Sequence, residues 1–205
     1  LTPFGKAKLG LQWLLFKSGF GRTNYFETGG FFKTRASEHI PNVQYEFVPM
    51  LGELQHGSVS LESGFQYFFN LLRPKSVGRV WTASADPFAA PKFQFNYFQH
   101  PDDLEQVIQA VKISREMVRQ KAWDELRGAE VNPGPENATD ADLKRWVKTI
   151  AGTTYHPCCT CRMGVDDMAV VDGEGRVHGL EALRVVDASI MPEIPSGNLN
   201  APTIM

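Results

Sequence analysis

The sequence predicts an α+β domain in which a mostly antiparallel sheet is flanked by helices. Residues 43–50 and 92–98 alternate apolar and polar side chains, which indicates strands with one buried face. After Asp102-Asp103, apolar residues recur at helical spacing, which indicates an amphipathic helix. The composition, 42% hydrophobic and 21% charged over 205 residues, is that of a folded globular chain.

The first elements follow from turn and capping signals. Thr2-Pro3 is an N-cap followed by proline, so a short helix is expected from here to Ser18-Gly19. Strands are expected at residues 43–50, 65–72, 78–85 and 92–98. The turn cluster at residues 73–76 has hairpin length, so we predict that the two strands beside it pair antiparallel.

Helices dominate the next part of the sequence. Asp102-Asp103 is expected to cap a helix that extends to Val118. Thr139-Asp140-Ala141-Asp142 resembles a capping box and predicts a second helix up to Ile150. Farther on, short strands at residues 169–171 and 183–186 are expected to flank a turn at residues 172–175.

The charge balance excludes some classes of partner. Twenty-one basic and 23 acidic residues give a net charge of −2, which provides no global field for nucleic acid or an anionic membrane. No apolar stretch approaches the ~20 residues that span a bilayer, and no export signal opens the sequence. We therefore expect a soluble, cytoplasmic protein. Because the sequence opens on Leu1 and ends in an apolar segment at Met205, we expect it to be part of a longer one.

All three cysteines lie within Cys158-Cys159-Thr160-Cys161, directly after His156-Pro157. A Cys-x-x-Cys pair beside a histidine suggests zinc or a redox disulfide, but a structural zinc site needs a second, distant ligand pair. No other cysteine is present. We predict no metal site and expect the cysteines to be small packed residues.

The other candidate motifs are weaker. Residues 173–178 contain Gly-x-Gly but lack the third glycine and carry acidic side chains, so they predict a turn. A nucleotide therefore either does not bind or has its main binding domain outside this sequence. His39, His56, His100 and His178 lie in polar or turn segments and are expected at the surface. His156 stands before a rigid proline in irregular chain, so it is either a catalytic base or a core histidine.

Two further segments have a functional and a structural interpretation. Asn198 and Asn200 lie between two prolines, and their amides offer both donors and acceptors for a polar ligand. The alternative is a capped turn before a helix. Asp187-Ala188 is either an N-cap or a group that holds a cofactor hydroxyl.

Three of these runs occur together in one family. Residues 155–164, 183–192 and 197–205 resemble the C-terminal half of a glucose-methanol-choline (GMC) oxidoreductase. Residues 23–31 and 168–179 are most similar to the choline dehydrogenase branch of that family. The resemblance extends over the whole sequence.

The resemblance implies the domain organisation. Residues 1–165 would form the substrate-binding domain, whose start includes a connector, and residues 166–205 would return to the FAD-binding domain. The N-terminal FAD-binding unit of the family is absent from this sequence, so FAD is not expected to stay tightly bound to this chain alone.

The resemblance also implies roles for single residues. His156 and Asn198 match the active-site positions, with His156 as the base that takes the hydroxyl proton. The positions expected to contact FAD are Asp187, Ala188 and Asn200, and those expected to contact substrate are Tyr25, Phe26 and Glu27.

The implied activity is oxidation of a primary alcohol, choline to betaine aldehyde, by hydride transfer to FAD. The alternatives are a dehydrogenase for an uncharged alcohol, and a non-catalytic binding domain or inactive fragment. Expected partners are the alcohol and an electron acceptor, with no nucleic acid. The resemblance leaves peripheral membrane association of the parent protein open.

Overall fold

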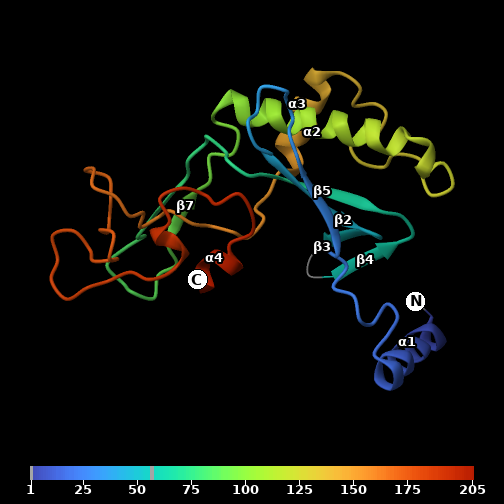
Figure 1. Cartoon of the computed structure of the whole chain (residues 1–205), viewed down its shortest axis with the longest axis horizontal. Helices are drawn as coiled ribbons and strands as arrows, with labels where there is room; N and C mark the ends of the chain where they lie inside the picture. Colours follow the sequence, from blue (N-terminus) through green and yellow to red (C-terminus); the bar gives the residue numbers. More distant parts are fainter. Residues whose placement is uncertain (1, 56–57) are drawn as a thin grey trace. The chain divides into compact units, whose positions relative to one another are not determined.

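The structure of the protein, a computed structural model, describes residues 2–55 and 58–205, and side chains outside residues 53–62. His56, expected at the surface, lies outside the described residues. The helices are α1 (Pro3–Phe16), α2 (Pro101–Arg119), α3 (Asp140–Ile150) and α4 (Asn200–Ile204), with 3-10 turns at Lys121–Trp123 and Ala188–Ile190 (Figure 1). The strands are β1 (Thr28–Phe32), β2 (Val43–Val48), β3 (Leu51–Gln55), β4 (Ser58–Glu62), β5 (Gln66–Leu71), β6 (Arg79–Trp81) and β7 (Lys92–Gln94).

Within the described residues the strands form a β1-β2-β5 sheet and two antiparallel pairs, β3-β4 and β6-β7. Helices combined with antiparallel strand pairs confirm the predicted α+β class. The chain divides into two compact units, Leu1–Phe31 with Tyr45–Phe69, and Phe32–Gln44 with Asn70–Met205. Each unit is described by itself. The assignment of residues 166–205 to an FAD-binding domain stays a prediction.

Aromatic side chains from β2, from β5 and from the residue just before β5 pack together in the first unit. The ring of Tyr45 lies 5.4 Å from that of Tyr67 and 5.3 Å from that of Phe69, and Phe47 lies 5.8 Å from Phe65. Burial, with a smaller contribution from Tyr45, raises the pKa of Tyr67 to about 12. The Tyr67 phenol therefore stays protonated at neutral pH.

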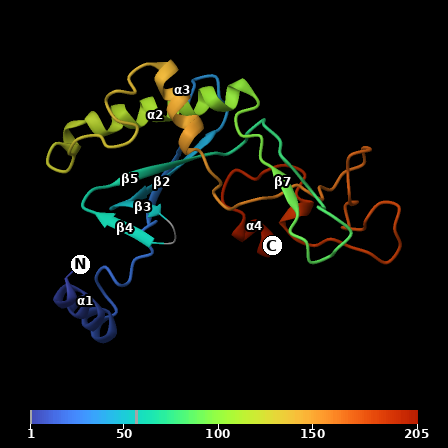
Figure 2. The same ribbon diagram turned by 180° about the vertical axis from the view of Figure 1, so that it is seen from behind.

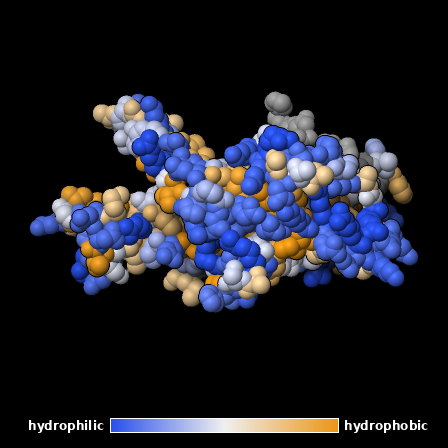
Figure 3. Space-filling model, turned by 90° about the horizontal axis from the view of Figure 1, so that it is seen from above, coloured by the Kyte–Doolittle hydropathy of each residue, from blue (hydrophilic) through white to orange (hydrophobic). Residues whose placement is uncertain are grey.

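Helix α1 begins where the sequence predicted. Thr2 Oγ1 accepts the N–H of Gly5 at 3.1 Å, and Pro3 is the first helical residue. No residue of α1 is buried, and Phe4 is 80% exposed. Apolar areas also reach the surface on the face drawn in Figure 3. None of the helices in the described part of the chain is both long and apolar enough to cross a membrane.

The core of the second unit is the crossing of α2 and α3 (Figures 1 and 2). Ile108 on α2 and Leu143 on α3 are fully buried, as the helical spacing predicted. The capping box of α3 is also confirmed. Thr139 Oγ1 accepts the N–H of Asp142 at 3.2 Å, and the Asp142 carboxylate accepts the N–H of Thr139 at 3.1 Å.

Helix α2 begins earlier than predicted. Its N-cap is His100, whose Nδ1 accepts the N–H of Asp102 at 3.2 Å. The aspartates lie inside the first turn, where the helix dipole favours negative charge. Asp103 is 1% exposed, and its two carboxylate oxygens accept the backbone N–H groups of Lys75 and Ser76, each at 2.8 Å.

The predicted hairpin between residues 65–72 and 78–85 is wrong. Strand β5 lies in the sheet with β1 and β2, whereas β6 pairs with β7. The cause is Asp103, because a buried carboxylate must be hydrogen-bonded and finds its donors in the 73–76 turn. This contact directs the turn toward α2 instead of back along β5.

Strands β6 and β7 are shorter than predicted, and the expectation of one buried face in residues 92–98 is wrong for β7. All of their residues are exposed. Asn96 and Phe98 have φ values of 56° and 58°, which end the extended conformation that the alternation in residues 92–98 had indicated.

Residues 169–171 and 183–186 form isolated bridges instead of the predicted strands. The turn between them is confirmed. Gly175 donates its N–H to the carbonyl of Asp172 at 3.0 Å and has a φ of 75°, in the left-handed region that favours glycine. The Gly-x-Gly sequence therefore makes a backbone turn.

A buried amide, Asn42, holds the chain just before β2. Asn42 Oδ1 accepts the N–H of Thr34 at 2.9 Å, and Nδ2 donates to Thr34 Oγ1 at 2.7 Å and to Gln106 Oε1 at 2.9 Å. Asn42 is 3% exposed, so these bonds replace those it would make to water. They attach the start of β2 to α2.

The Asp102 carboxylate predicts a loss of stability in acid. It accepts hydrogen bonds from Arg35 Nη1 at 2.7 Å and Gln106 Nε2 at 3.0 Å, and lies 2.9 Å from Lys75 Nζ. The hydrogen bonds from Arg35 and Lys75 hold the pKa of Asp102 well below its ordinary value. Folding therefore favours the ionised carboxylate, and the stability it contributes is present above the unfolded pKa of about 4 and lost as the pH falls toward the lower folded value.

We expect Asp102→Asn to lower the free energy of unfolding by about 1–3 kcal/mol at pH 7. The difference from wild type should shrink below pH 4, measured by urea unfolding at several pH values. Asp124→Asn is the control, since Asp124 and its partner Arg127 form an exposed ion pair at 2.5 Å. A difference that is independent of pH would contradict the role given to the Asp102 charge.

Candidate active site

His156 follows a turn that sets the direction of its side chain. Thr153 Oγ1 accepts the N–H of Tyr155 at 3.0 Å, and Tyr155 has a φ of 60°. Pro157 then restricts the backbone on the other side. The imidazole is half-buried, which agrees with neither a solvated loop histidine nor one sealed in a core.

Three backbone hydrogen bonds join the segment after His156 to the 3-10 turn at Ala188–Ile190. Cys159, Cys161 and Met163 donate their N–H groups to the carbonyls of Ala188 at 3.4 Å, Ser189 at 2.9 Å and Ile190 at 2.8 Å. These contacts bring together two parts of the chain that lie about 30 residues apart. The segment with Asn198 follows directly after the turn.

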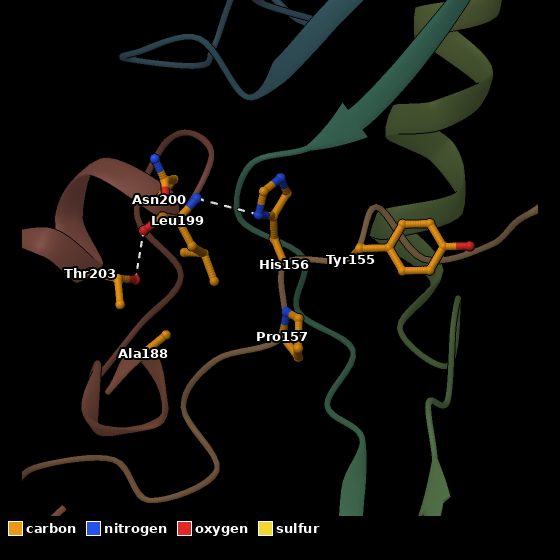
Figure 4. A pocket seen from close by; sticks show the side chains of 7 residues that line it. All are labelled: Tyr155, His156, Pro157, Ala188, Leu199, Asn200 and Thr203. Carbon is orange, nitrogen blue, oxygen red and sulfur yellow. Dashed lines mark hydrogen bonds between the residues drawn. The ribbon is translucent and has the colours of Figure 1, made fainter. Parts of the chain in front are cut away.

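His156 and Asn198 meet in space, as the resemblance implied. Asn198 Nδ2 lies 2.9 Å from His156 Nε2, and Asn198 Oδ1 accepts a hydrogen bond from Gln44 Nε2 at 3.0 Å. The backbone N–H of Leu199 faces the other ring nitrogen, His156 Nδ1, at 3.4 Å (Figure 4). An imidazole and a primary amide thus share one hydrogen bond across 42 residues of sequence.

An open cavity of about 320 Å³ lies beside His156. The side chains around it come from three segments of the second unit (Figure 4). They belong to Tyr155, His156, Pro157, Ala188, Leu199, Asn200 and Thr203. Of the predicted cofactor positions, Ala188 and Asn200 therefore line the same cavity as the histidine.

Asp187 forms the N-cap that was one of its two interpretations. Its Oδ1 accepts the backbone N–H of Ser189 at 2.8 Å and the Ser189 hydroxyl at 2.5 Å. These hydrogen bonds lower the pKa of Asp187. The carboxylate therefore holds the turn that carries Ala188, and its contact with a cofactor stays a prediction.

The predicted substrate residues lie in the first unit. Tyr25 and Glu27 line a small cavity of about 60 Å³, together with Thr23, Thr28, Phe47 and Pro49. Phe26 is 54% exposed, and its ring lies 6.3 Å from that of Phe68. Glu27 is exposed.

Glycine is required next to Glu27. A Cβ atom at Gly29 would lie 2.4 Å from the carbonyl oxygen of Tyr45, so β1 can approach β2 this closely only without a side chain. The Glu-Thr-Gly-Gly run thus fixes the strand that begins directly after Glu27.

The sequence analysis missed Gln44, Tyr155 and Thr203. Gln44 is the polar residue between Val43 and Tyr45 in the predicted strand 43–50, and strand alternation places it on the face opposite the buried Val43. The alternation thus indicates the face that Gln44 occupies, but a role for Gln44 follows only once its hydrogen-bond partner, Asn198, is known. Tyr155 and Thr203 line the cavity and lie within the runs 155–164 and 197–205, but no role was predicted for either residue.

The cysteines pack against one another. Cys158 Sγ lies 3.1 Å from Cys159 Sγ, and both thiols are partly buried. In residues 2–55 and 58–205, no three His, Cys, Asp or Glu side chains are arranged to hold a metal ion. Burial and the neighbouring Cys159 thiol raise the pKa of Cys158 to about 12.

Comparison with known proteins relates this site to one enzyme family. The chain is 48% identical over its full length to an oxygen-dependent choline dehydrogenase of Klebsiella pneumoniae and 50% identical to one of Paraburkholderia phytofirmans. It covers 37% and 36% of their lengths, so it spans little more than a third of these relatives. The family model for GMC oxidoreductases matches residues 74–205, which include His156 and Asn198. The chain belongs to the GMC oxidoreductase family.

A solved GMC structure has the same fold. An Aspergillus oryzae RIB40 formate oxidase variant, solved to follow FAD modification, superposes with a TM-score of 0.82 over 97% of this chain and 39% of its own, at 23% identity. The family membership confirms the resemblance found in the sequence. The roles of the single residues in this GMC chain remain predictions.

The raised pKa of Cys158 predicts a poorly reactive thiol. Because the thiolate is the species that reacts and binds metal, alkylation of Cys158 by iodoacetamide at pH 7.5 should be orders of magnitude slower than that of free cysteine. Mass spectrometry of labelled peptides measures the rate, and the urea-unfolded chain, in which all three cysteines should react, is the control. Rapid labelling of native Cys158, or stoichiometric zinc in the purified protein, would contradict this prediction.

Proposed function

We propose that this chain is the C-terminal part of an FAD-dependent GMC dehydrogenase that oxidises a primary alcohol, with His156 as the base. The observation that carries the proposal is the 2.9 Å contact between His156 Nε2 and Asn198 Nδ2 beside the cavity. A non-catalytic binding domain would have no use for an imidazole and an amide that converge at the edge of a cavity.

His156 and Asn198 match the two requirements of alcohol oxidation, which are a proton acceptor and a group that orients the hydroxyl. A free hydroxyl is too weak an acid to lose its proton at neutral pH, so it needs an acceptor such as a neutral imidazole, which contributes roughly 10²–10⁴ in rate. An alcohol oxygen that replaces the mutual hydrogen bond can donate to His156 Nε2 and accept from Asn198 Nδ2. Asn198 thereby orients the hydroxyl and holds its carbon in a fixed direction.

The cavity suits one part of FAD. Asn200 offers an amide donor and acceptor, and Ala188 leaves room because its side chain is a single methyl group. We assign both to the cofactor, with Asp187 holding the turn that carries Ala188. When bound, FAD supplies the acceptor for the hydride that leaves the alcohol carbon. In this proposal, the unit that binds the phosphates of FAD lies outside this chain.

The base assignment predicts a large effect of one substitution. In the flavin-loaded enzyme, His156→Ala should slow flavin reduction in a single turnover by about 10²–10⁴ while the flavin stays bound. Asn198→Ala should have a smaller effect, because it removes orientation and keeps the base. His178→Ala is the control, since His178 is an exposed ring that contacts the carbonyl of Gly164. A His156→Ala enzyme reduced at the wild-type rate would assign the base to another residue.

We propose choline as the substrate, with an alcohol of similar shape but no charge as the alternative. The identity of 48–50% to choline dehydrogenases supports choline. A quaternary ammonium cannot donate a hydrogen bond, so it needs a carboxylate and aromatic faces. Each aromatic contact contributes about 0.5–2 kcal/mol. Tyr25 and Glu27 offer these two groups in one small cavity.

The role of Glu27 can be tested with a matched pair of substrates. In the flavin-loaded enzyme, Glu27→Gln should raise KM for choline strongly and barely change KM for 3,3-dimethylbutanol. The reason is that only the charged substrate loses a Coulomb partner. Steady-state kinetics with both alcohols measures the difference. Equal losses would make Glu27 structural and favour the uncharged alcohol.

A further inference from the structure

We propose that Arg73 is a positioning residue that holds the loop carrying Asn198, residues 192–198, against the chain before β2. Its guanidinium bridges the two segments. Nη1 donates to Ser196 Oγ at 2.6 Å, and Nη2 donates to the carbonyl of Pro41 at 2.6 Å. Ser196 lies two residues before Asn198. The functional meaning of the bridge rests on the proposed role of Asn198, but the bridge itself does not.

The loop at residues 192–198 depends on side chains for its position. Among the residues that the structure describes, no backbone–backbone hydrogen bond joins this loop to another segment. Inside the loop, the N–H of Gly197 donates to the carbonyl of Pro195 at 2.7 Å, which makes a three-residue turn with Ser196 at its centre. Arg73 therefore binds the loop at the residue where its direction changes.

The bond from Arg73 is stronger than the neutral bond that also attaches this loop. Gln44 Nε2 donates to Asn198 Oδ1 at 3.0 Å, and neither of these amides is charged. The bond from Arg73 to Ser196 is shorter, at 2.6 Å, and its donor is a cation. Hydrogen bonds from ionised donors are roughly twice as strong as those between neutral groups. We therefore expect the loop to lose order when the Arg73 bond is removed and the Gln44 bond is kept.

The backbone is fixed on both sides of Arg73. Leu72 is 4% exposed and donates its N–H to the carbonyl of Asn42 at 3.0 Å. On the other side, the buried carboxylate of Asp103 accepts two N–H groups of the 73–76 turn, each at 2.8 Å. A side chain on a rigid support positions its partner more precisely than one on a mobile loop. The loop is thus held by a guanidinium whose own backbone cannot follow it.

The bridge affects the proposed reaction through Asn198. The Asn198 amide lies 2.9 Å from the His156 ring, so a loop shift of about 1 Å would break this contact. A displacement of that size can lower a reaction rate by about 10²-fold. Loss of the Arg73 bond should therefore remove the orientation of the alcohol and leave the proposed base in place.

The bond to the loop can be removed from either partner. Arg73→Met removes both bonds of the bridge, whereas Ser196→Ala removes only the bond to the loop. Backbone ¹⁵N relaxation of this chain gives an order parameter for each residue, about 0.85 in rigid backbone and below about 0.6 in flexible backbone. Arg119→Met is the control, since Arg119 is an exposed arginine in the last turn of α2.

We expect the order parameters of residues 196–198 to fall below about 0.6 in Arg73→Met and in Ser196→Ala. Residues 159–163, which are held by backbone hydrogen bonds, should keep their wild-type values, and Arg119→Met should change neither segment.

Three results would overturn the proposal. They are a wild-type loop that is already flexible, unchanged loop order in Ser196→Ala, and an equal loss of order in residues 159–163 of Ser196→Ala. The last result would mean that the bond stabilises the fold in general. If Arg73→Met fails to fold, Ser196→Ala applies the same criteria, because it keeps the bond between Arg73 and Pro41.

A second measurement separates this proposal from the proposed function. In the flavin-loaded enzyme, Ser196→Ala should slow flavin reduction in a single turnover by at least about tenfold. In an Asn198→Ala enzyme the same substitution should have little further effect, because the loop then carries no amide to position. Equal slowing in both enzymes would contradict positioning through Asn198.

The loop order and the rate can also disagree. A disordered loop with an unchanged rate would uphold the positioning role of Arg73 and contradict the role proposed for Asn198. A loop that stays ordered in Ser196→Ala would contradict the positioning role whatever the rate.

Discussion

The ladder between residues 159–163 and the Ala188–Ile190 turn is the interaction on which the site depends. Its three N–H donors come from the segment after His156, and its acceptors lie just before the segment that carries Asn198. Backbone bonds depend little on side-chain identity, so the ladder holds whichever small residues occupy positions 158–161. Three partly buried thiols therefore fit a segment whose backbone makes the contacts.

The segments that carry Gln44 and Arg73 are held by buried polar side chains of α2 and of the chain before β2. Asn42 is bound to Thr34 and Gln106 and stands two residues before Gln44. Asp103 holds the turn at Lys75 and Ser76, close in sequence to Arg73. Both side chains are almost fully buried, so losing either partner would leave a polar group without water or protein to bind it.

The site itself is built from two amides and an imidazole. Gln44, Asn198 and His156 form one hydrogen-bonded series, in which Gln44 Nε2 donates to Asn198 Oδ1 and Asn198 Nδ2 lies 2.9 Å from His156 Nε2. Such a series suits proton abstraction from an alcohol, because a neutral base gains a charge only when the reaction proceeds.

Local patterns in the sequence determined the elements whose causes are local. The Thr2 cap, the Thr139 capping box, the buried faces of α2 and α3, and the strands β2 and β5 depend on residues a few positions apart. The motif around His156 and Asn198 was also readable, because its residue types occur together in one family. Tertiary structure alone decided that β5 does not form a hairpin with β6, because that outcome depends on Asp103, about 30 residues away. It also decided that Gln44 meets Asn198 across 154 residues, since a side chain that alternates out of a strand has no partner until the chain has folded.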